Sequence, residues 1–126
     1  MFIKPDELKN LPPMNTRYKL GETLTEEQLA FLDAYGFVHF EGVASKDEVE
    51  GIISELERIE GEWATEERDS INGIPLFWGK DDRGAKFLQR FAFTSRHSKF
   101  ISKFVTHSRF EPIRRLVGED ARIGED

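Results

Sequence analysis

The chain has 126 residues, a net charge of −6 and no cysteine. This length allows one domain with a modest core, and the absence of cysteine excludes disulfides, zinc–thiolate sites and thiol catalysis. Hydrophobic residues make up 38% and charged residues 33% of the chain, which is typical of a globular protein rather than a disordered one. No apolar run approaches the roughly 20 residues of a membrane span. The opening MFIKPDELKN lacks the apolar run of a signal peptide, so we expect a cytoplasmic location.

Charge is distributed unevenly along the chain. Residues 1–79 carry 7 Lys/Arg against 17 Asp/Glu, a net charge of −10, whereas residues 80–126 carry 11 against 7, a net charge of +4. Charged runs usually form solvated surface, so an acidic helix face followed by a basic one is the simplest interpretation. The alternative is that the second half faces an acidic substrate or a phosphate.

Residues 1–23 are predicted to be an N-terminal extension, because three prolines interrupt any long element: Pro5, Pro12 and Pro13. The first helix is predicted to start at Thr25, which forms a T-x-x-Q capping box with Gln28. Leu29, Leu32 and Phe31 are its inward-facing candidates, and Gly36 supplies a left-handed C-terminal cap.

Residues 37–40 (FVHF) then read as a short strand, because aromatic and β-branched side chains fit a pleated surface. A second capping box, Ser45 with Glu48, opens the next helix. Its apolar residues recur at helical spacing: Val49, Ile52, Ile53, Leu56 and Ile59.

The polar stretch 64–73 is predicted to be a loop with a turn at Asn72-Gly73. Residues 74–80 and 86–94 are predicted to be strands on either side of a turn at 81–84. Alternation along the second strand would place four side chains on one face: Phe87, Gln89, Phe91 and Phe93.

Two short helices are predicted to follow, the first with the apolar stripe Phe100, Ile101, Phe104 and Val105, the second with Phe110, Ile113, Leu116 and Val117. Ser108 and Glu111 are a candidate capping box for the second helix, which is predicted to end at Gly118. The fold class is therefore α+β.

The order of these elements resembles the N-terminal part of the phytanoyl-CoA dioxygenase family, which are Fe(II)- and 2-oxoglutarate-dependent oxygenases. The similarity runs from about Leu24 to the C-terminus. It rests on the helix ending in Y-G-F-V, the E-G-V turn, the S-K-D-E-V helix, and the segment HSRFEPIRRLVGEDARI, which is similar to the family's paired short helices ending in L-x-G-x-D. The order and spacing of the pieces carry the resemblance. The charged loop at 64–73 and His39, where the family usually has an aliphatic residue, depart from it.

The resemblance implies that residues 24–126 are the N-terminal part of a larger domain, in which helices and antiparallel strands belong to a double-stranded β-helix. Such a barrel holds iron by an H-x-[DE]…H triad, which leaves three metal positions for 2-oxoglutarate and oxygen. The sequence ends at Asp126, ahead of the segment where the family carries that triad. We therefore expect Fe(II) and 2-oxoglutarate to bind a longer protein and not this chain by itself. The small organic substrate, and the choice between hydroxylation and halogenation, depend on residues beyond Asp126.

The resemblance also implies four site residues. It places LQRFAF on the strand that feeds the barrel, where relatives often have a polar or basic residue near the co-substrate, so Gln89 and Arg90 are candidates for binding 2-oxoglutarate. Arginine grips a carboxylate through two parallel hydrogen bonds. Phe77 and Trp78 on the preceding strand are candidates for lining a substrate pocket, with packing in the core as the simpler interpretation.

His39-Phe40-Glu41 matches H-x-E formally, and His97 or His107 would complete a triad by composition. Two-residue matches are common by chance, so we interpret all three histidines as polar surface or capping residues and predict no metal ligand among them.

A non-enzymatic α+β module is the alternative function. Its basic, Phe-rich second half would contact an anionic partner through Lys86, Arg90, Arg96, Lys99, Lys103, Arg114 and Arg115. The acidic isoelectric point of about 5.2 argues against nucleic acid as that partner. Self-association through exposed apolar helix faces is a further expectation for a partial domain.

Overall fold

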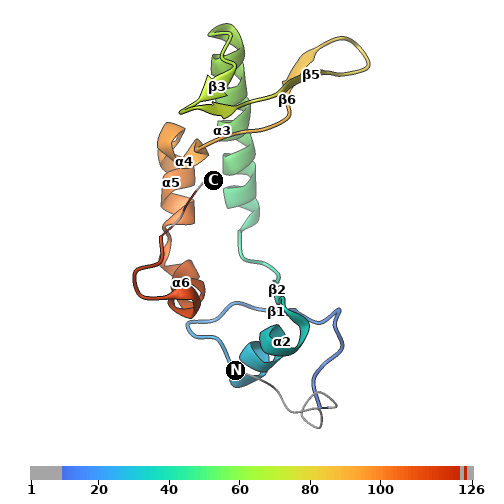
Figure 1. The fold of residues 1–126 in the computed structure, drawn as a ribbon, viewed down its shortest axis with the longest axis vertical. Coiled ribbons are helices and arrows are strands. Elements are labelled where there is room, and N and C mark those ends of the chain that lie inside the picture. The colour runs from blue at the N-terminus through green and yellow to red at the C-terminus, as the bar shows by residue number, and fades with distance from the viewer. Residues whose placement is uncertain (1–9, 123, 125–126) are drawn as a thin grey trace. The chain divides into compact units, whose positions relative to one another are not determined.

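The computed structural model describes residues 10–122 and 124. The chain is an α+β protein of helices and two-stranded sheets (Figure 1). The helices are α2 (Glu26–Tyr35), α3 (Lys46–Thr65), α4 (Thr94–His97), α5 (Lys99–Val105), the 3-10 turn η1 (Ser108–Phe110) and α6 (Glu111–Val117). The strand pairs of this described part are β1 (Arg17–Tyr18) with β2 (His39–Phe40), β3 (Ser70–Ile71) with β4 (Ile74–Pro75), and β5 (Trp78–Lys80) with β6 (Lys86–Leu88).

The chain divides into two compact units. Within the described residues, unit 1 comprises residues 10–45 and 108–121, and unit 2 comprises residues 46–107, 122 and 124. None of the described helices is long and apolar enough to cross a membrane.

Helix α2 in unit 1 begins and ends at the predicted capping residues. The Thr25 hydroxyl accepts a hydrogen bond from the Gln28 backbone N–H at 3.1 Å, and the Gln28 side chain accepts from the Thr25 N–H at 3.0 Å, so the capping box is confirmed. Gly36 ends the helix at φ 78°, a left-handed conformation that suits glycine. The Gln28 amide also donates to the Lys19 carbonyl at 3.3 Å, which explains how this polar side chain can be buried.

Phe31 is the centre of the unit 1 core. Its side chain is 0% exposed, whereas Leu29 and Leu32, the other inward-facing candidates, are only half-buried. Three aromatic rings meet it edge-on, with centroids 4.5–5.8 Å away: Tyr18, Tyr35 and Phe37. Such edge-to-face pairs add stability beyond the area that they bury.

The strand predicted at 37–40 is shorter in the structure. Strand β2 comprises only His39 and Phe40, and the Phe37 ring before it lies edge-on to Phe31. The predicted N-terminal extension supplies its partner, since β1 pairs with β2 in parallel and Tyr18 lies beside Phe40. The predicted N-terminal extension is therefore part of unit 1 from at least β1 onwards.

Helix α3 is the longest described element of unit 2, and it continues past the predicted loop start at residue 64 to Thr65. It begins directly after Ser45, as predicted. Its apolar stripe is buried unevenly: Ile59 and Trp63 are buried, whereas Val49 and Ile53 are exposed. The buried end lies under the small strand pairs, which Figure 1 shows at the C-terminal end of α3.

The predicted turn at Asn72-Gly73 is confirmed as the loop of a hairpin. Strands β3 and β4 pair antiparallel on either side of it, with Ile71 opposite Ile74. Asn72 and Gly73 both have positive φ, at 48° and 81°. Two successive left-handed residues define the type I′ turn that matches the twist of a hairpin, and Asn-Gly is its preferred sequence.

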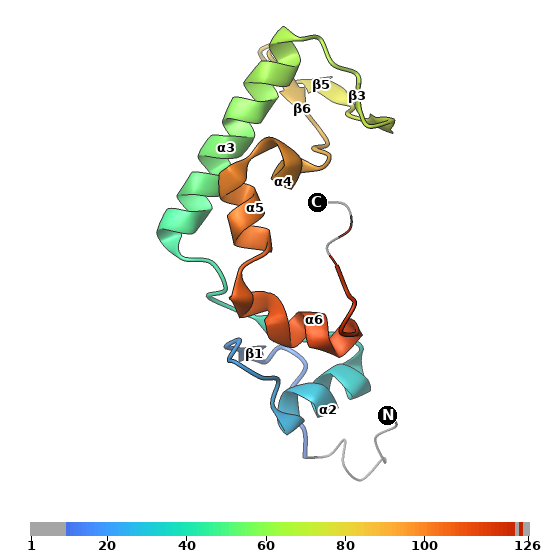
Figure 2. The ribbon, with the colours of Figure 1, turned by 90° about the vertical axis from the view of Figure 1, so that its left-hand side faces the viewer.

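The unit 2 core lies between α3, the hairpins and the α4–α5 pair. Its buried members are Ile59, Trp63, Ile71, Leu76, Leu88, Ala92 and Ile101. Figure 2 shows α4 and α5 alongside α3. Trp63 contributes the largest side chain, and its indole meets the Phe91 ring at 6.1 Å and the His97 ring edge-on at 5.2 Å.

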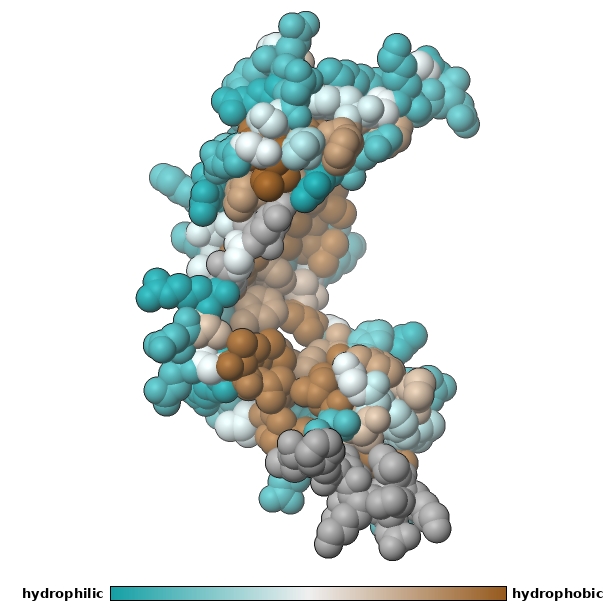
Figure 3. Space-filling view, viewed as in Figure 1, coloured by the Kyte–Doolittle hydropathy of each residue, from teal (hydrophilic) through white to brown (hydrophobic). Residues whose placement is uncertain are grey.

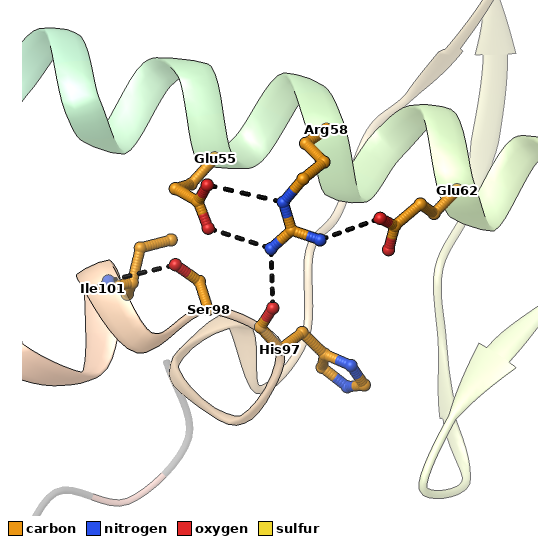
Figure 4. A network of polar contacts seen from close by, with 6 residues as sticks. All are labelled: Glu55, Arg58, Glu62, His97, Ser98 and Ile101. Carbon is orange, nitrogen blue, oxygen red and sulfur yellow. Dashed lines mark hydrogen bonds and ion pairs between the residues drawn. The ribbon is translucent and has the colours of Figure 1, made fainter.

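A polar network on Arg58 joins α3 to the junction of α4 and α5 (Figure 4). The guanidinium donates to the Glu55 and Glu62 carboxylates and to the His97 carbonyl, each at 2.8–2.9 Å. Hydrogen bonds from Arg58, and then from Ser98, hold the pKa of Glu55 below its usual value. Ser98 also caps α5 by accepting from the Ile101 N–H at 3.1 Å.

Two expectations about residues 86–118, one about a strand and one about a helix cap, need correction. The predicted strand 86–94 ends at Leu88, because Ala92 enters the core and Thr94 already starts α4. The capping box of Ser108 with Glu111 is wrong: Ser108 opens the 3-10 turn, so α6 starts after Phe110, without a side-chain cap. Helix α6 ends before Gly118, as predicted.

Candidate functional site

All four site residues that the sequence singled out lie in or directly beside the hairpin of β5 and β6, whose turn is tightly specified. The Asp81 carboxylate accepts from the backbone N–H groups of Arg83 at 2.9 Å and Ala85 at 2.8 Å. The Asp81 N–H donates to the Ala85 carbonyl, and Gly84 adopts a φ of 80°. The predicted turn is therefore confirmed, and Asp81 is a turn-forming side chain.

Register assigns the hairpin residues to two faces. Trp78 pairs with Leu88, and Gly79 pairs with Phe87. Leu88 is buried and Trp78 packs against the unit 2 core. A Cβ atom on Gly79 would lie 2.8 Å from the Phe87 ring and 2.6 Å from the Gln89 amide nitrogen. Phe87 and Gln89 therefore lie together over Gly79, on the face opposite Trp78.

The structure separates the two residues proposed to line a substrate pocket. The Trp78 indole N–H donates to the Arg68 carbonyl at 2.7 Å, and the Lys86 ammonium lies 4.3 Å from the indole centroid. Trp78 therefore has core contacts on one side and a cation on its ring. Phe77, by contrast, is 57% exposed and has a positive φ of 52°. Of the two, Phe77 is the residue available to a ligand.

Gln89 and Arg90 follow β6 directly, and both are exposed. Two hydrogen bonds from backbone N–H groups fix this stretch: the Gln89 N–H donates to the Phe77 carbonyl at 2.8 Å, and the Leu88 N–H donates to the Glu60 carboxylate at 2.9 Å. The second bond ties the hairpin to α3. Backbone held in this way presents the Gln89 and Arg90 side chains from a defined position.

Phe87 is the residue of this surface that the sequence analysis left without a role. It is 40% exposed and stacks over Gly79. The signal was present, because an isolated glycine inside a strand marks a place where another group approaches the backbone closely. We call the surface formed by Phe77, Phe87 and Gln89 the hairpin face. Figure 3 shows hydrophilic side chains at the turn end of the hairpin and more hydrophobic ones towards the helices.

The three histidines are divided between the two units. His39 lies in unit 1, whereas His97 and His107 lie in unit 2. The His97 ring packs on Trp63, and Glu41 forms an ion pair with Lys19 at 3.4 Å. Across residues 10–122 and 124, no group of three or more His, Asp or Glu side chains is placed to hold a metal ion.

The seven basic residues proposed to contact an anionic partner are divided between the two units. Arg114 and Arg115 belong to unit 1 and the other five to unit 2. Arg96 lies 4.7 Å from the Phe93 ring centroid, and Arg114 forms an ion pair with Glu111. Together with Lys86 on Trp78, and with Arg90, which also has an interaction within the chain, at least four of the seven have intramolecular partners. These contacts weaken the argument for a dedicated anion-binding surface.

Comparison of the chain with family models, with curated proteins and with solved structures finds no match in any of the three.

Proposed function

We propose that this chain is the N-terminal segment of an Fe(II)- and 2-oxoglutarate-dependent oxygenase, similar to the phytanoyl-CoA dioxygenases, that hydroxylates a small organic molecule. The observation that carries the proposal is the run from Thr25 to Thr65. This run consists of a helix that starts with a capping box and ends at Gly36, a short strand, a turn at Gly42 with φ 67°, and a second, longer helix. The sequence resemblance rests on this order of elements.

The hairpin face and the adjacent Arg90 have the chemistry that the proposal needs from this part of the chain. In the complete enzyme, Arg90 would pair with a carboxylate of 2-oxoglutarate and Gln89 would donate an amide hydrogen bond to it. Phe77 and Phe87 would contact the apolar part of a substrate. The iron supplies the oxidative chemistry in such enzymes, and its ligands would come from residues outside this sequence. The β5–β6 pair would join the sheet of the double-stranded β-helix.

The direct test begins with the transcript that encodes this chain. The proposal expects an open frame that continues past Asp126 and encodes an H-x-D pair soon afterwards, with a later His and Arg. The protein expressed from that frame should consume 2-oxoglutarate only when Fe(II) is supplied. Turnover that is independent of metal, or a frame that closes at Asp126, contradicts the proposal.

Arg90 gives a sharper test within the longer protein. Arg90→Gln removes the charge and the two-pronged donor, and should raise the KM for 2-oxoglutarate about tenfold or more, as expected for the loss of a charged hydrogen bond. Arg83→Gln at the exposed turn is the matched control and should leave the KM unchanged. Equal effects of the two variants would remove Arg90 from the proposed site.

A further inference from the structure

Phe77 has an unfavourable backbone conformation and is largely exposed to solvent. Its φ is 52°, in the left-handed region, where a bulky side chain is an outlier. The residue is 57% exposed. Within the described part of the chain, it is not among the hydrophobic side chains that pack against the unit 2 core, and no aromatic ring or cation contacts it. Both features disfavour a phenylalanine at this position in the free protein.

Phe93 has the same conformation, and packing stabilises it there. Its φ is 55°, and it directly precedes α4. Unlike Phe77, it packs against the unit 2 core, and the Arg96 guanidinium lies 4.7 Å from its ring centroid. Packing therefore accounts for a phenylalanine at position 93 but not at position 77. Strained residues cluster at sites that bind ligands, so a ligand for the Phe77 ring is the remaining explanation.

The Phe87 ring lies across the same strand pair. A Cβ atom on Gly79 would be 2.8 Å from Cζ and 3.0 Å from Cε1 of this ring. Gly79 is the cross-strand partner of Phe87, so the ring leans over it, and a glycine leaves room for that approach. Phe87 is 40% exposed. The side of its ring that points away from Gly79 is therefore open to a ligand.

We propose that the hairpin face binds the flat ring of a small aromatic molecule against Phe77 and Phe87, with the Gln89 amide as a polar partner for a substituent. Aromatic rings attract one another beyond the area that they bury, whereas a saturated ring of the same size contributes that area alone. The Gln89 N–H donates to the Phe77 carbonyl at 2.8 Å, which keeps these residues adjacent. An aromatic substrate for the enzyme rests on the oxygenase proposal, whereas binding of the ring rests on the hairpin.

Two probes of matched size test this selectivity: benzyl alcohol and its saturated counterpart, cyclohexylmethanol. Each is titrated into the 126-residue, ¹⁵N-labelled protein without iron or 2-oxoglutarate, and its Kd is obtained from the backbone amide shifts of Gly79 and Gln89. Benzyl alcohol should bind about 2- to 10-fold more tightly, the factor that an aromatic pair contributes. Equal affinities, or no shift with either probe up to its solubility limit, overturn the proposal. The oxygenase proposal is tested by turnover of the longer protein, so the two can fail separately.

The same substitution at two positions should have opposite effects. Asparagine tolerates the left-handed conformation better than phenylalanine does. Phe77→Asn should therefore leave the melting temperature of unit 2 unchanged or higher, and should abolish the preference for benzyl alcohol. Phe93→Asn should lower the melting temperature by about 4 °C or more, because it removes a packed ring. It should keep the preference at temperatures where the protein is folded.

Gly79→Ala is a second test of the binding surface. The added methyl group displaces the Phe87 ring and leaves Phe77 in place, so the preference for benzyl alcohol should fall. If Phe77→Asn lowers the melting temperature as much as Phe93→Asn, the Phe77 ring has a structural role and the proposal is wrong. A preference for benzyl alcohol that survives in both Phe77→Asn and Gly79→Ala also overturns it.

Discussion

Replacing Gly51 by alanine is expected to destabilise the folded protein, although Gly51 lies inside helix α3. The Phe100 ring of α5 lies directly against this glycine of α3. An added Cβ atom would be 2.3 Å from Cζ of that ring and 2.6 Å from Cε1, whereas ordinary van der Waals contact begins at 3.4 Å. The ring would therefore have to move by about 1 Å, which disturbs the contact between the two helices.

Two opposing terms set the size of the effect. Alanine is favoured over glycine inside a helix by about 1 kcal/mol. Overpacking of a well-packed contact costs about 1–3 kcal/mol, so Gly51→Ala should change the free energy of unfolding by between zero and about −2 kcal/mol. Gly61 is a matched control on the same helix, because nothing lies within 4 Å of its Cβ position. Gly61→Ala should therefore stabilise unit 2 by about 1 kcal/mol.

Urea unfolding followed by tryptophan fluorescence measures this difference. Both tryptophans, Trp63 and Trp78, belong to unit 2, so the signal reports on the unit that contains both glycines. The two variants should differ by about 1–3 kcal/mol. In a Phe100→Ala background the difference should largely disappear. The reasoning is refuted if Gly51→Ala stabilises the protein as much as Gly61→Ala, or if the difference persists without the ring.

Three further perturbations test other parts of the structure. Thr25→Ala should cost about 1 kcal/mol in urea unfolding through loss of the helix cap, and Thr25→Ser should restore most of it. Partial burial, and then the hydrogen bond to Glu27, raise the pKa of Tyr18 to about 12 from 10.0. The unfolded chain therefore loses this proton first, and stability should fall as the pH rises from about 10 to 12; Tyr18→Phe should remove that fall, and equal pH profiles would contradict it. Ile59→Ala should cost about 2–5 kcal/mol, against less than about 1 for Val49→Ala at the exposed end of the same stripe.

The sequence by itself determined the features that depend on neighbours within a few residues. The Thr25–Gln28 box, the left-handed Gly36, and the Asn72-Gly73 turn all followed from the chemistry of adjacent side chains and backbone groups. The turn at Asp81 belongs with them, because one carboxylate and one glycine specify it. In each of these places the interacting atoms are at most four residues apart, so no knowledge of the tertiary structure is needed.

Only the tertiary structure decided which apolar residues are buried. Periodicity treated Val49 and Ile59 alike, yet Ile59 is buried and Val49 is exposed. It also placed Phe91 on a strand, whereas the structure packs it against Trp63, 28 residues earlier in the chain. The candidate site shows the same division: Phe77 and Trp78 are adjacent in sequence, and only pairing with β6 and packing on α3 decide that Trp78 faces the core. Burial depends on contacts between residues far apart in sequence, which local patterns do not encode.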